Sequence, residues 1–307
     1  MFTRRRVYSP SGLITMLRLR GVRDSDCDRL PLAMAVCGQI EASATSHDSE
    51  GRPLDHTLLK AVHSVLPPHP VIQGAYATSD HKREFLRTIF DDTAADYDRI
   101  ERWLSLGTGR RYRRQALIRA GLRPGMRVAD IAVGTGLVAA EALDVIGSGG
   151  SLVGVDPSLE MMRRAKDRLG IQTVVGIAEA LPIDTAGFDF VSMGYALRHV
   201  TDLNTVFSEF HRVLKPGGRA CILEITRPRT AMGRAVLRGY LSTVCPIASK
   251  FTKLAPRTPE LWKYYWETID KCVPAERIMD AMRTAGFINV NRTVSCGLFS
   301  EYTAATQ

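Results

Sequence analysis

The stretch RVADIAVGTG at residues 127–136 decides the fold, and Asp156 follows it twenty residues after Gly136. The apolar run Arg127–Ala132 predicts a buried β-strand, and the glycines at 134 and 136 predict a tight turn into a helix. Glycines let a ligand lie against the backbone, and a helix N-terminus offers unpaired N–H groups. Asp156 would end the next strand, where a carboxylate can accept hydrogen bonds from both hydroxyls of a ribose. This combination indicates a site for a nucleoside-type cofactor.

Short apolar strands and helices alternate on both sides of this stretch. Strands are predicted at Arg127–Ala132, Ser151–Val155, Gln172–Val175, Phe188–Met193 and Ala220–Ile225, and helices at Leu137–Ile146, Leu159–Leu169 and Leu203–Leu214. A helix at Ala275–Ala285 and strands at Asn289–Thr293 and Gly297–Thr303 are predicted at the end of the chain. Such alternation predicts an α/β fold with a doubly wound parallel sheet and helices on both faces.

Two classes of cofactor compete for the glycine turn. Residues 134–139, GTGLVA, satisfy the dinucleotide fingerprint G-x-G-x-x-G/A, which favours an NAD(P)- or flavin-dependent oxidoreductase. Asp130 favours the other class, because its charge would repel a pyrophosphate and attract the ammonium and sulfonium groups of S-adenosylmethionine. A third interpretation is that Asp130 only caps the loop by accepting from backbone N–H groups. The electrostatic argument favours S-adenosylmethionine.

The net charge of +9 is concentrated in two segments of the 307-residue chain. Residues 1–23 hold six arginines and no acidic residue, and residues 225–259 hold seven basic residues and no acidic one. The rest of the chain therefore has a net charge of −4, which suits a cationic cofactor and argues against a nucleic-acid partner. Six scattered cysteines, with no CxxC pair, predict free thiols in a reducing compartment and no metal site.

The chain divides into an extension and one domain. Residues 1–80 are rich in Ser, Pro, Asp and His and show little periodicity, so we expect a flexible extension: a basic tail, a targeting segment or sequence upstream of the true start. Residues 81–307 form the predicted domain. Within it, residues 81–121 are a helical lead-in and residues 225–270 are a basic and aromatic insert that would act as a lid.

Five segments, at residues 128–136, 151–158, 178–183, 188–202 and 212–226, resemble in order and spacing the motifs of class I S-adenosylmethionine-dependent methyltransferases. The resemblance covers about residues 85–307. It implies a Rossmann-like, mostly parallel sheet of seven strands with an N-terminal helical lid, and S-adenosylmethionine as the cofactor.

Within that class the sequence is most similar to the ubiquinone/menaquinone-biosynthesis C-methyltransferases. The similarity lies in Tyr97-Asp98 after a helical lead-in, in LRHVTD at residues 197–202, and in RVLKPGGR at residues 212–219 followed by Leu223-Glu224. It implies methylation of a ring carbon of a prenylated quinol or a related lipophilic phenol. The alternative is an O- or N-methyltransferase of another small molecule.

The resemblance also assigns the expected cofactor residues. These are Asp130, Gly134, Thr135, Gly136, Asp156, Ile177, Ala178 and Gly194. The sequence departs from the family at Val133, where a glycine or cysteine is usual, and at Ile177, where a polar residue would meet the adenine amine. Adenine would therefore be held by the Ala178 backbone and by packing against Ile177.

Arg198, His199 and Tyr97 are the expected catalytic residues. A ring carbon becomes nucleophilic when the quinol loses a phenolic proton, so a base helps. His199, where the family has asparagine, would take that proton, Arg198 would stabilise the phenolate, and Tyr97 would line the acceptor pocket. The competing interpretation is that Arg198 and His199 cap the following helix beside Thr201 and Asp202.

The basic insert carries an apolar row at Met232, Val236, Tyr240 and Val244, with arginines between them. Such a helix can lie on a bilayer, cover a lipophilic acceptor, or pack on the domain with solvated charges. Aromatic residues at 261–266 would face partly the core and partly a pocket. Since no signal-peptide core or membrane-spanning run is present, we expect a cytoplasmic protein, either free or peripheral to the inner membrane.

Overall fold

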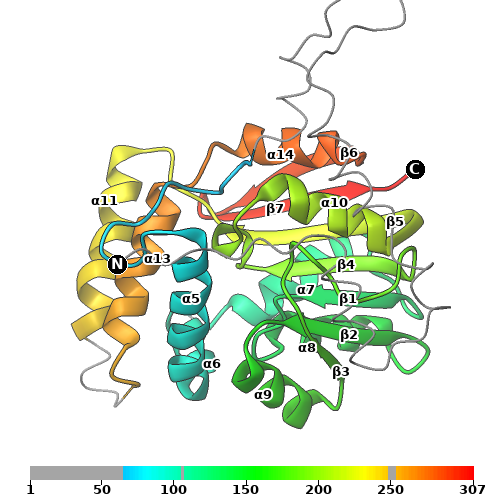
Figure 1. Ribbon diagram of the computed structural model, residues 1–307, viewed down its shortest axis with the longest axis horizontal. Coiled ribbons are helices and arrows are strands. Elements are labelled where there is room, and N and C mark those ends of the chain that lie inside the picture. The colour runs from blue at the N-terminus through cyan, green and yellow to red at the C-terminus, as the bar shows by residue number, and fades with distance from the viewer. Residues whose placement is uncertain (1–64, 105–106, 248–253) are drawn as a thin grey trace, which may run out of the picture. The chain divides into compact units, whose positions relative to one another are not determined.

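The computed structural model describes residues 65–104, 107–247 and 254–307, and the expectations for residues 1–64 lie outside them. A seven-stranded sheet has the order β3-β2-β1-β4-β5-β7-β6 (Figure 1). Its strands are β1 (Arg127–Ile131), β2 (Ser151–Asp156), β3 (Gln172–Val175), β4 (Phe188–Gly194), β5 (Leu214–Ile225), β6 (Ile288–Ser295) and β7 (Phe299–Ala305). Strands β1 to β5 pair in parallel, and β7 is antiparallel to both neighbours. The predicted fold class is confirmed.

Helices cover both faces of the sheet because its central strands are apolar on both sides. Along β5, Ala220 and Ile222 pack with α10 (Leu203–Val213) and α14 (Ala275–Thr284), whereas Cys221 and Leu223 belong to the opposite cluster. That second cluster contains residues of α7 (Gly109–Arg119), α8 (Leu137–Ile146) and α9 (Leu159–Leu169). Alternate residues of a strand point to opposite faces, so one strand contributes to two cores.

A third apolar cluster lies beside the sheet, on the left in Figure 1. Its helices are α5 (Ser79–Thr93), α6 (Tyr97–Leu104), α11 (Ala231–Gly239), the π-helical turn η3 (Tyr240–Val244) and α13 (Thr258–Asp270), and the short helix η1 (Ala94–Asp96) connects α5 to α6. Trp262 and Tyr265 of α13 are among the largest fully buried side chains. The lead-in and the insert, far apart in sequence, thus share one core. No helix of the described ranges is long and apolar enough to cross a bilayer.

Two expectations about boundaries need correction. Strand β5 begins at Leu214 rather than Ala220, because the Lys-Pro-Gly-Gly segment is a bulge within the strand, with a register shift against β4 and Gly217 at φ +74°. Residues 65–80, expected in the extension, belong to the packed unit that starts at Val65. Ile72 and Tyr76 are buried there, the Leu66 amide donates to Asp202 Oδ1, and the Leu66 carbonyl accepts from the Leu203 amide.

Candidate functional site

A cavity lies past the carboxyl ends of β1, β2 and β4, where ligands bind in open α/β sheets. Three groups of residues line it: Gly134, Asp156, Ile177 and Ala178 from the loops after β1 to β3; Gly194, Tyr195 and His199 after β4; and Leu86, Phe90 and Tyr97 from the lead-in helices. The lining therefore combines polar groups at the strand ends with aromatic side chains, and we call the part around Gly134 and Asp156 the donor end and the part around Phe90, Tyr97 and His199 the acceptor end.

The two glycines of the first turn have different functions. Both have left-handed backbones, with φ +55° at Gly134 and +83° at Gly136. Gly134 lines the cavity, and a Cβ built there would meet no atom within 4 Å. A Cβ on Gly136 would lie 2.7 Å from Leu169 Cδ1 of α9. Gly134 therefore leaves room for a ligand, whereas Gly136 allows the turn to pack against α9.

Asp156 holds the turn and also lines the cavity. Its Oδ2 accepts a hydrogen bond from the Gly134 amide at 2.9 Å, and its Oδ1 accepts one from the Ser158 amide at 2.8 Å. Burial raises the pKa of Asp156 to about 6, although these two hydrogen bonds lower it because they favour the charged form. At neutral pH the carboxylate is ionised, and each oxygen keeps a lone pair that can accept from a ribose hydroxyl.

Asp130 lies deeper than Asp156 and does not line the cavity. Its Oδ1 accepts a hydrogen bond from Ser192 Oγ at 2.7 Å, while the buried Oδ2 has no hydrogen-bond partner among the described residues. Burial raises the pKa of Asp130 to about 7. An unpaired carboxylate oxygen below the glycine turn fits a cationic ligand such as S-adenosylmethionine. The Gly134 amide of the glycine turn donates to Asp156 and not to Asp130.

The other expected cofactor residues are distributed around the same cavity. Ile177 and the buried Ala178 line it after β3, where adenine is expected. Gly194 lines it at the end of β4, and a Cβ there would lie only 2.4 Å from Val138 Cγ2 of α8. A glycine at 194 is thus required by the close approach of α8.

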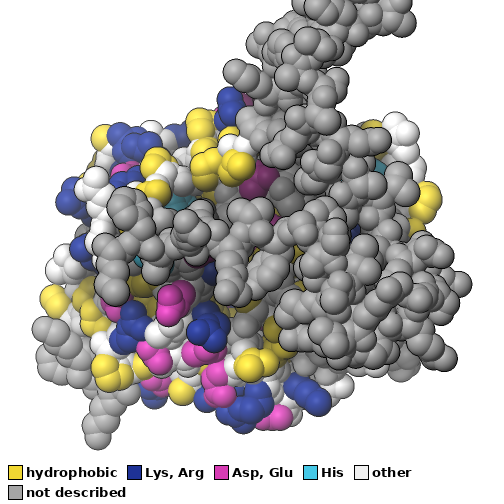
Figure 2. Space-filling model, in the orientation of Figure 1, with side chains coloured by type: hydrophobic (Ala, Val, Ile, Leu, Met, Phe, Trp, Pro, Cys, Tyr) yellow, Lys and Arg dark blue, Asp and Glu magenta, His cyan; other side chains and the backbone are white. Residues whose placement is uncertain are grey.

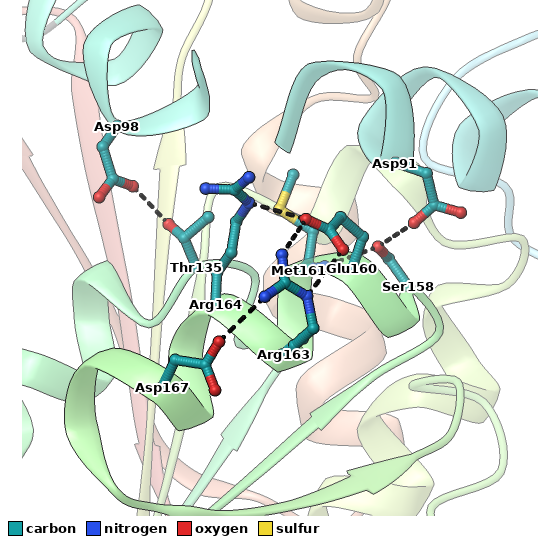
Figure 3. A network of polar contacts seen from close by, with 9 residues as sticks. All are labelled: Asp91, Asp98, Thr135, Ser158, Glu160, Met161, Arg163, Arg164 and Asp167. Atoms are coloured by element: carbon teal, nitrogen blue, oxygen red, sulfur yellow. Dashed lines mark hydrogen bonds and ion pairs between the residues drawn. The ribbon is translucent and has the colours of Figure 1, made fainter. Parts of the chain in front are cut away.

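Thr135 does not line the cavity but ties the glycine turn to the lead-in helices. Its Oγ1 donates to Asp98 Oδ1 of α6 at 2.6 Å, and Ser158 Oγ donates to Asp91 Oδ1 of α5 at 2.5 Å (Figure 3). Asp98 also pairs with Arg168 of α9 at 2.7 Å. These bonds fasten α5 and α6 to the loops after β1 and β2, so the lead-in covers the donor end as a lid.

His199 lies in an aromatic environment at the other end of the cavity. Its Nδ1 shares a 3.0 Å hydrogen bond with Tyr264 Oη, its ring stacks on Tyr264 at 5.4 Å, and Phe90 contacts it edge-on at 5.3 Å. Burial, followed by the charges of Arg198 and Lys82, holds the pKa of His199 well below 6.5. The imidazole is therefore neutral at neutral pH and has one nitrogen lone pair available.

Arg198 is not brought into this cavity. Its side chain is 2% exposed, forms an ion pair with Glu224, and lies over the Tyr265 ring with Cζ 4.9 Å from the ring centroid. It lines a smaller adjoining cavity together with Tyr97 and Tyr195. The arrangement suits a structural ion pair better than direct stabilisation of a phenolate.

The helix-cap interpretation of Arg198 and His199 is wrong. The N-cap of α10 is Asp202, whose carboxylate accepts from the amides of Asn204 and Thr205. Arg198 and His199 belong to the short 3-10 helix η2 (Leu197–His199).

Several residues of the site were not predicted from the sequence. Tyr264 and Phe90 contact His199, and Glu224 balances Arg198. The acidic Glu224 at the end of an apolar strand was a usable signal, because a carboxylate in a buried strand needs a cationic partner. Ala132 and Tyr195, directly after β1 and β4, have φ of +55° and +60°, a strained backbone that no residue pattern announces.

Comparisons with known proteins identify the family. The profile of the ubiE/COQ5 methyltransferase family matches residues 77–304. The "Ubiquinone/menaquinone biosynthesis C-methyltransferase UbiE" of Shewanella woodyi is 32% identical over 222 residues, covering 70% of this chain and 87% of that protein. The protein of the same name from Serratia proteamaculans is 33% identical over 218 residues, covering 69% and 86%.

A solved structure supports the fold. The S-adenosylmethionine-dependent methyltransferase of Thermotoga maritima, described as a possible histamine N-methyltransferase, has a TM-score of 0.53 and 23% identity, covering 72% of this chain and 99% of that one. The family match, the relatives and the cavity lead to one conclusion. The chain belongs to the ubiE/COQ5 methyltransferase family and is an S-adenosylmethionine-dependent methyltransferase.

Proposed function

We propose that the enzyme methylates a ring carbon of a prenylated quinol or a related lipophilic phenol, in ubiquinone or menaquinone biosynthesis. The observation that carries the proposal is the mixed lining of one cavity: Asp156 and Gly134 form its donor end, and Phe90, Tyr97 and His199 form its acceptor end. A cationic nucleoside suits the first end, and a planar apolar ring suits the second. The names of the relatives support the same acceptor class.

Bound S-adenosylmethionine supplies an electrophilic methyl group at a sulfonium. Asp156 would orient the ribose, the loop at Ile177 and Ala178 would hold the adenine, and Asp130 would attract the cationic end. The task left to the protein is to hold the acceptor carbon about 3–3.5 Å from the methyl group and in line with it, and to exclude water. The aromatic side chains of α5, α6 and α13 perform that exclusion.

His199 is the proposed base. When Nδ1–H donates to Tyr264 Oη, Nε2 keeps the free lone pair, and the proton of the phenolic hydroxyl would pass to Nε2, directly or through one water. The neighbouring ring carbon of the phenolate would then form a bond to the methyl carbon as the bond from methyl carbon to sulfur breaks and S-adenosylhomocysteine is released. The ring proton at that carbon would pass to water as the ring becomes aromatic again. Tyr97, buried beside Tyr265, would pack against the acceptor ring.

The acceptor is tested in a host that lacks quinone C-methylation. The wild-type gene should restore the methylated quinone, identified by mass spectrometry of extracted lipids with an isotope-labelled methyl donor, and Asp156→Ala should not. A label recovered on an oxygen or a nitrogen, or on a compound other than a quinone, would replace this proposal with O- or N-methylation. Calorimetric titration with S-adenosylmethionine and with NADH tests the cofactor separately.

We also propose that the reaction takes place in the cytoplasm at the inner face of the membrane. A prenylated acceptor partitions into the bilayer, so the enzyme would meet the acceptor at the bilayer surface.

A further inference from the structure

Helix α11 exposes its apolar side chains to solvent, the reverse of the usual arrangement. Met232 is 76% exposed and Val236 is 66% exposed. Ala235 and Gly239 are exposed as well, and at spacings of three and four residues all four positions share one side of the helix. Leu237, on the opposite side, is buried in the third core. The four exposed positions on this side of α11 are therefore all uncharged.

Further large apolar side chains are exposed after α11. Val244 is 49% exposed and Ile247 is 51% exposed, in the turns that follow. A groove between α11 and the β6–β7 hairpin opens beside Val236, and Val294 and Leu298 of the hairpin line its other wall. We name the surface formed by Met232, Val236, Val244 and Ile247 the α11 face. A soluble surface rarely groups so many large apolar side chains without a partner.

Arginines border the α11 face. Arg229 and Arg238 are exposed, and the structure shows no acidic partner for either among the described residues. Arg227 pairs with Asp270 of α13 at 3.2 Å. Over residues 225–259 the sequence has seven basic residues and no acidic one. In Figure 2, basic and hydrophobic side chains lie next to one another at the upper left, over α11.

We propose that the α11 face docks on the surface of an anionic phospholipid bilayer, with Met232 and Val236 inserted among the lipids and Arg229 and Arg238 at the headgroup phosphates. Apolar residues flanked by basic ones are what an interfacial helix requires. The inference rests on the proposed function only in one respect: docking would give the enzyme access to an acceptor that lies in the lipid.

Charge argues against a second copy of the chain and against residues 1–23 as occupants of the α11 face. A symmetric contact with a second copy would bring the arginines of both copies together. The N-terminal residues 1–23 hold six arginines and no acid, so they would be repelled by the same border. An anionic bilayer satisfies both the apolar side chains and the arginines.

The apolar part is tested by vesicle flotation of the full chain. The wild-type protein should float with vesicles that contain phosphatidylglycerol, and Met232→Glu with Val236→Glu should lower the partition coefficient roughly tenfold or more. The matched control is Ile118→Glu with Val175→Glu, which changes side chains 49% and 55% exposed elsewhere on the domain. Equal binding by the two double variants would overturn the proposal.

The contribution of the arginines is tested with the same vesicles, using two double variants that change the net charge of the protein by the same amount. Arg229→Glu with Arg238→Glu should weaken binding by roughly tenfold or more, whereas Arg111→Glu with Arg123→Glu, also exposed, should have a smaller effect. Added salt should weaken wild-type binding, and inorganic phosphate should not compete beyond its ionic strength. Wild-type binding to pure phosphatidylcholine as strong as to the anionic vesicles would overturn the charge argument.

Two further readings separate the proposal from its alternatives. A wild-type dimer that Met232→Glu converts to a monomer would assign the face to a second copy and overturn the proposal. Methylation of a short-chain, water-soluble quinol should be unchanged in every variant of the face. Vesicle binding is measured without acceptor, so it stands or fails independently of whether the enzyme methylates a quinol.

Discussion

The two ends of the cavity are built in different ways. The donor end comes from one stretch of chain, where Asp156 binds the backbone amides of Gly134 and Ser158. The acceptor end gathers side chains from helices far apart in sequence, including Phe90 of α5 and Tyr264 of α13, around His199. Main-chain hydrogen bonds of a short segment impose the first geometry, whereas packing of a whole helical core imposes the second. The donor end should therefore tolerate changes in the lid, and the acceptor end should not.

The largest effect is expected where the acceptor end depends on a buried ion pair. Glu224→Ala leaves the 2% exposed guanidinium of Arg198 without its carboxylate, so the free energy of unfolding should fall by about 3–5 kcal/mol. Replacing both residues, Arg198→Met with Glu224→Met, should cost less than the single change. Denaturant unfolding measures both. A single variant as stable as the wild type would show that the pair does not hold the acceptor end together.

The next effect concerns catalysis at the acceptor end. His199→Ala should lower kcat by roughly 100-fold or more, the usual share of a general base, and leave the affinity for the methyl donor unchanged. Because the pKa of His199 is well below 6.5, the wild-type rate should show no histidine-dependent loss as the pH falls from 7 to 6. Calorimetry and pH-rate profiles check the two parts. A reduced donor affinity would instead place His199 at the donor end.

The same contrast explains what the sequence could predict. The bounds of α8 (Leu137–Ile146), α9 (Leu159–Leu169) and β3 (Gln172–Val175) match the predicted ones, because local periodicity and glycine positions determine them. Asp156 and Gly134 were found for the same reason, since the glycine spacing and the strand end are both local. This part of the donor end was predictable because Asp130, Gly134 and Asp156 lie within about thirty residues of one another in the chain.

The acceptor end was predictable only in part. His199 was found through the family motif, but its partners Tyr264 and Phe90 depend on how α13 and α5 pack, which no local pattern encodes. Arg198 was assigned to the phenolate, yet it pairs with Glu224 from the neighbouring strand β5. The apolar row of α11 was visible in the sequence, but not the fact that it faces solvent. Tertiary packing decided each of these outcomes.

A smaller effect is expected at the donor end. Asp156→Ala should weaken binding of S-adenosylmethionine by about 1–3 kcal/mol, because a charged acceptor of hydrogen bonds is lost. Asp91→Ala, which removes only the link from α5 to Ser158, serves as the control and should change donor affinity less. Isothermal titration calorimetry measures both variants. If the control weakened binding as much as Asp156→Ala, the donor end would depend on the lid and the contrast between the two ends would fail.

The smallest effect tests why a carboxylate with an unpaired oxygen is buried below the glycine turn. The pKa of Asp130 is raised from 3.8 to about 7, so between these values the folded protein binds a proton that the unfolded chain has released. The free energy of unfolding should therefore fall as the pH rises through this window, and Asp130→Asn should reduce that fall by about 1 kcal/mol or more. Thermal unfolding at pH 5 and pH 8, without donor, measures the difference.

Adding S-adenosylmethionine should stabilise the wild type and Asp130→Asn to different extents. If Asp130 attracts the cationic end of the donor, ligand binding stabilises the wild type more than Asp130→Asn, because only the wild type gains a partner for its buried charge. Equal stabilisation of both proteins would leave Asp130 as a structural residue bonded to Ser192. In that case Asp156 and Gly134 alone would hold the donor, and the geometry of the glycine turn, not the charge of Asp130, would determine donor binding.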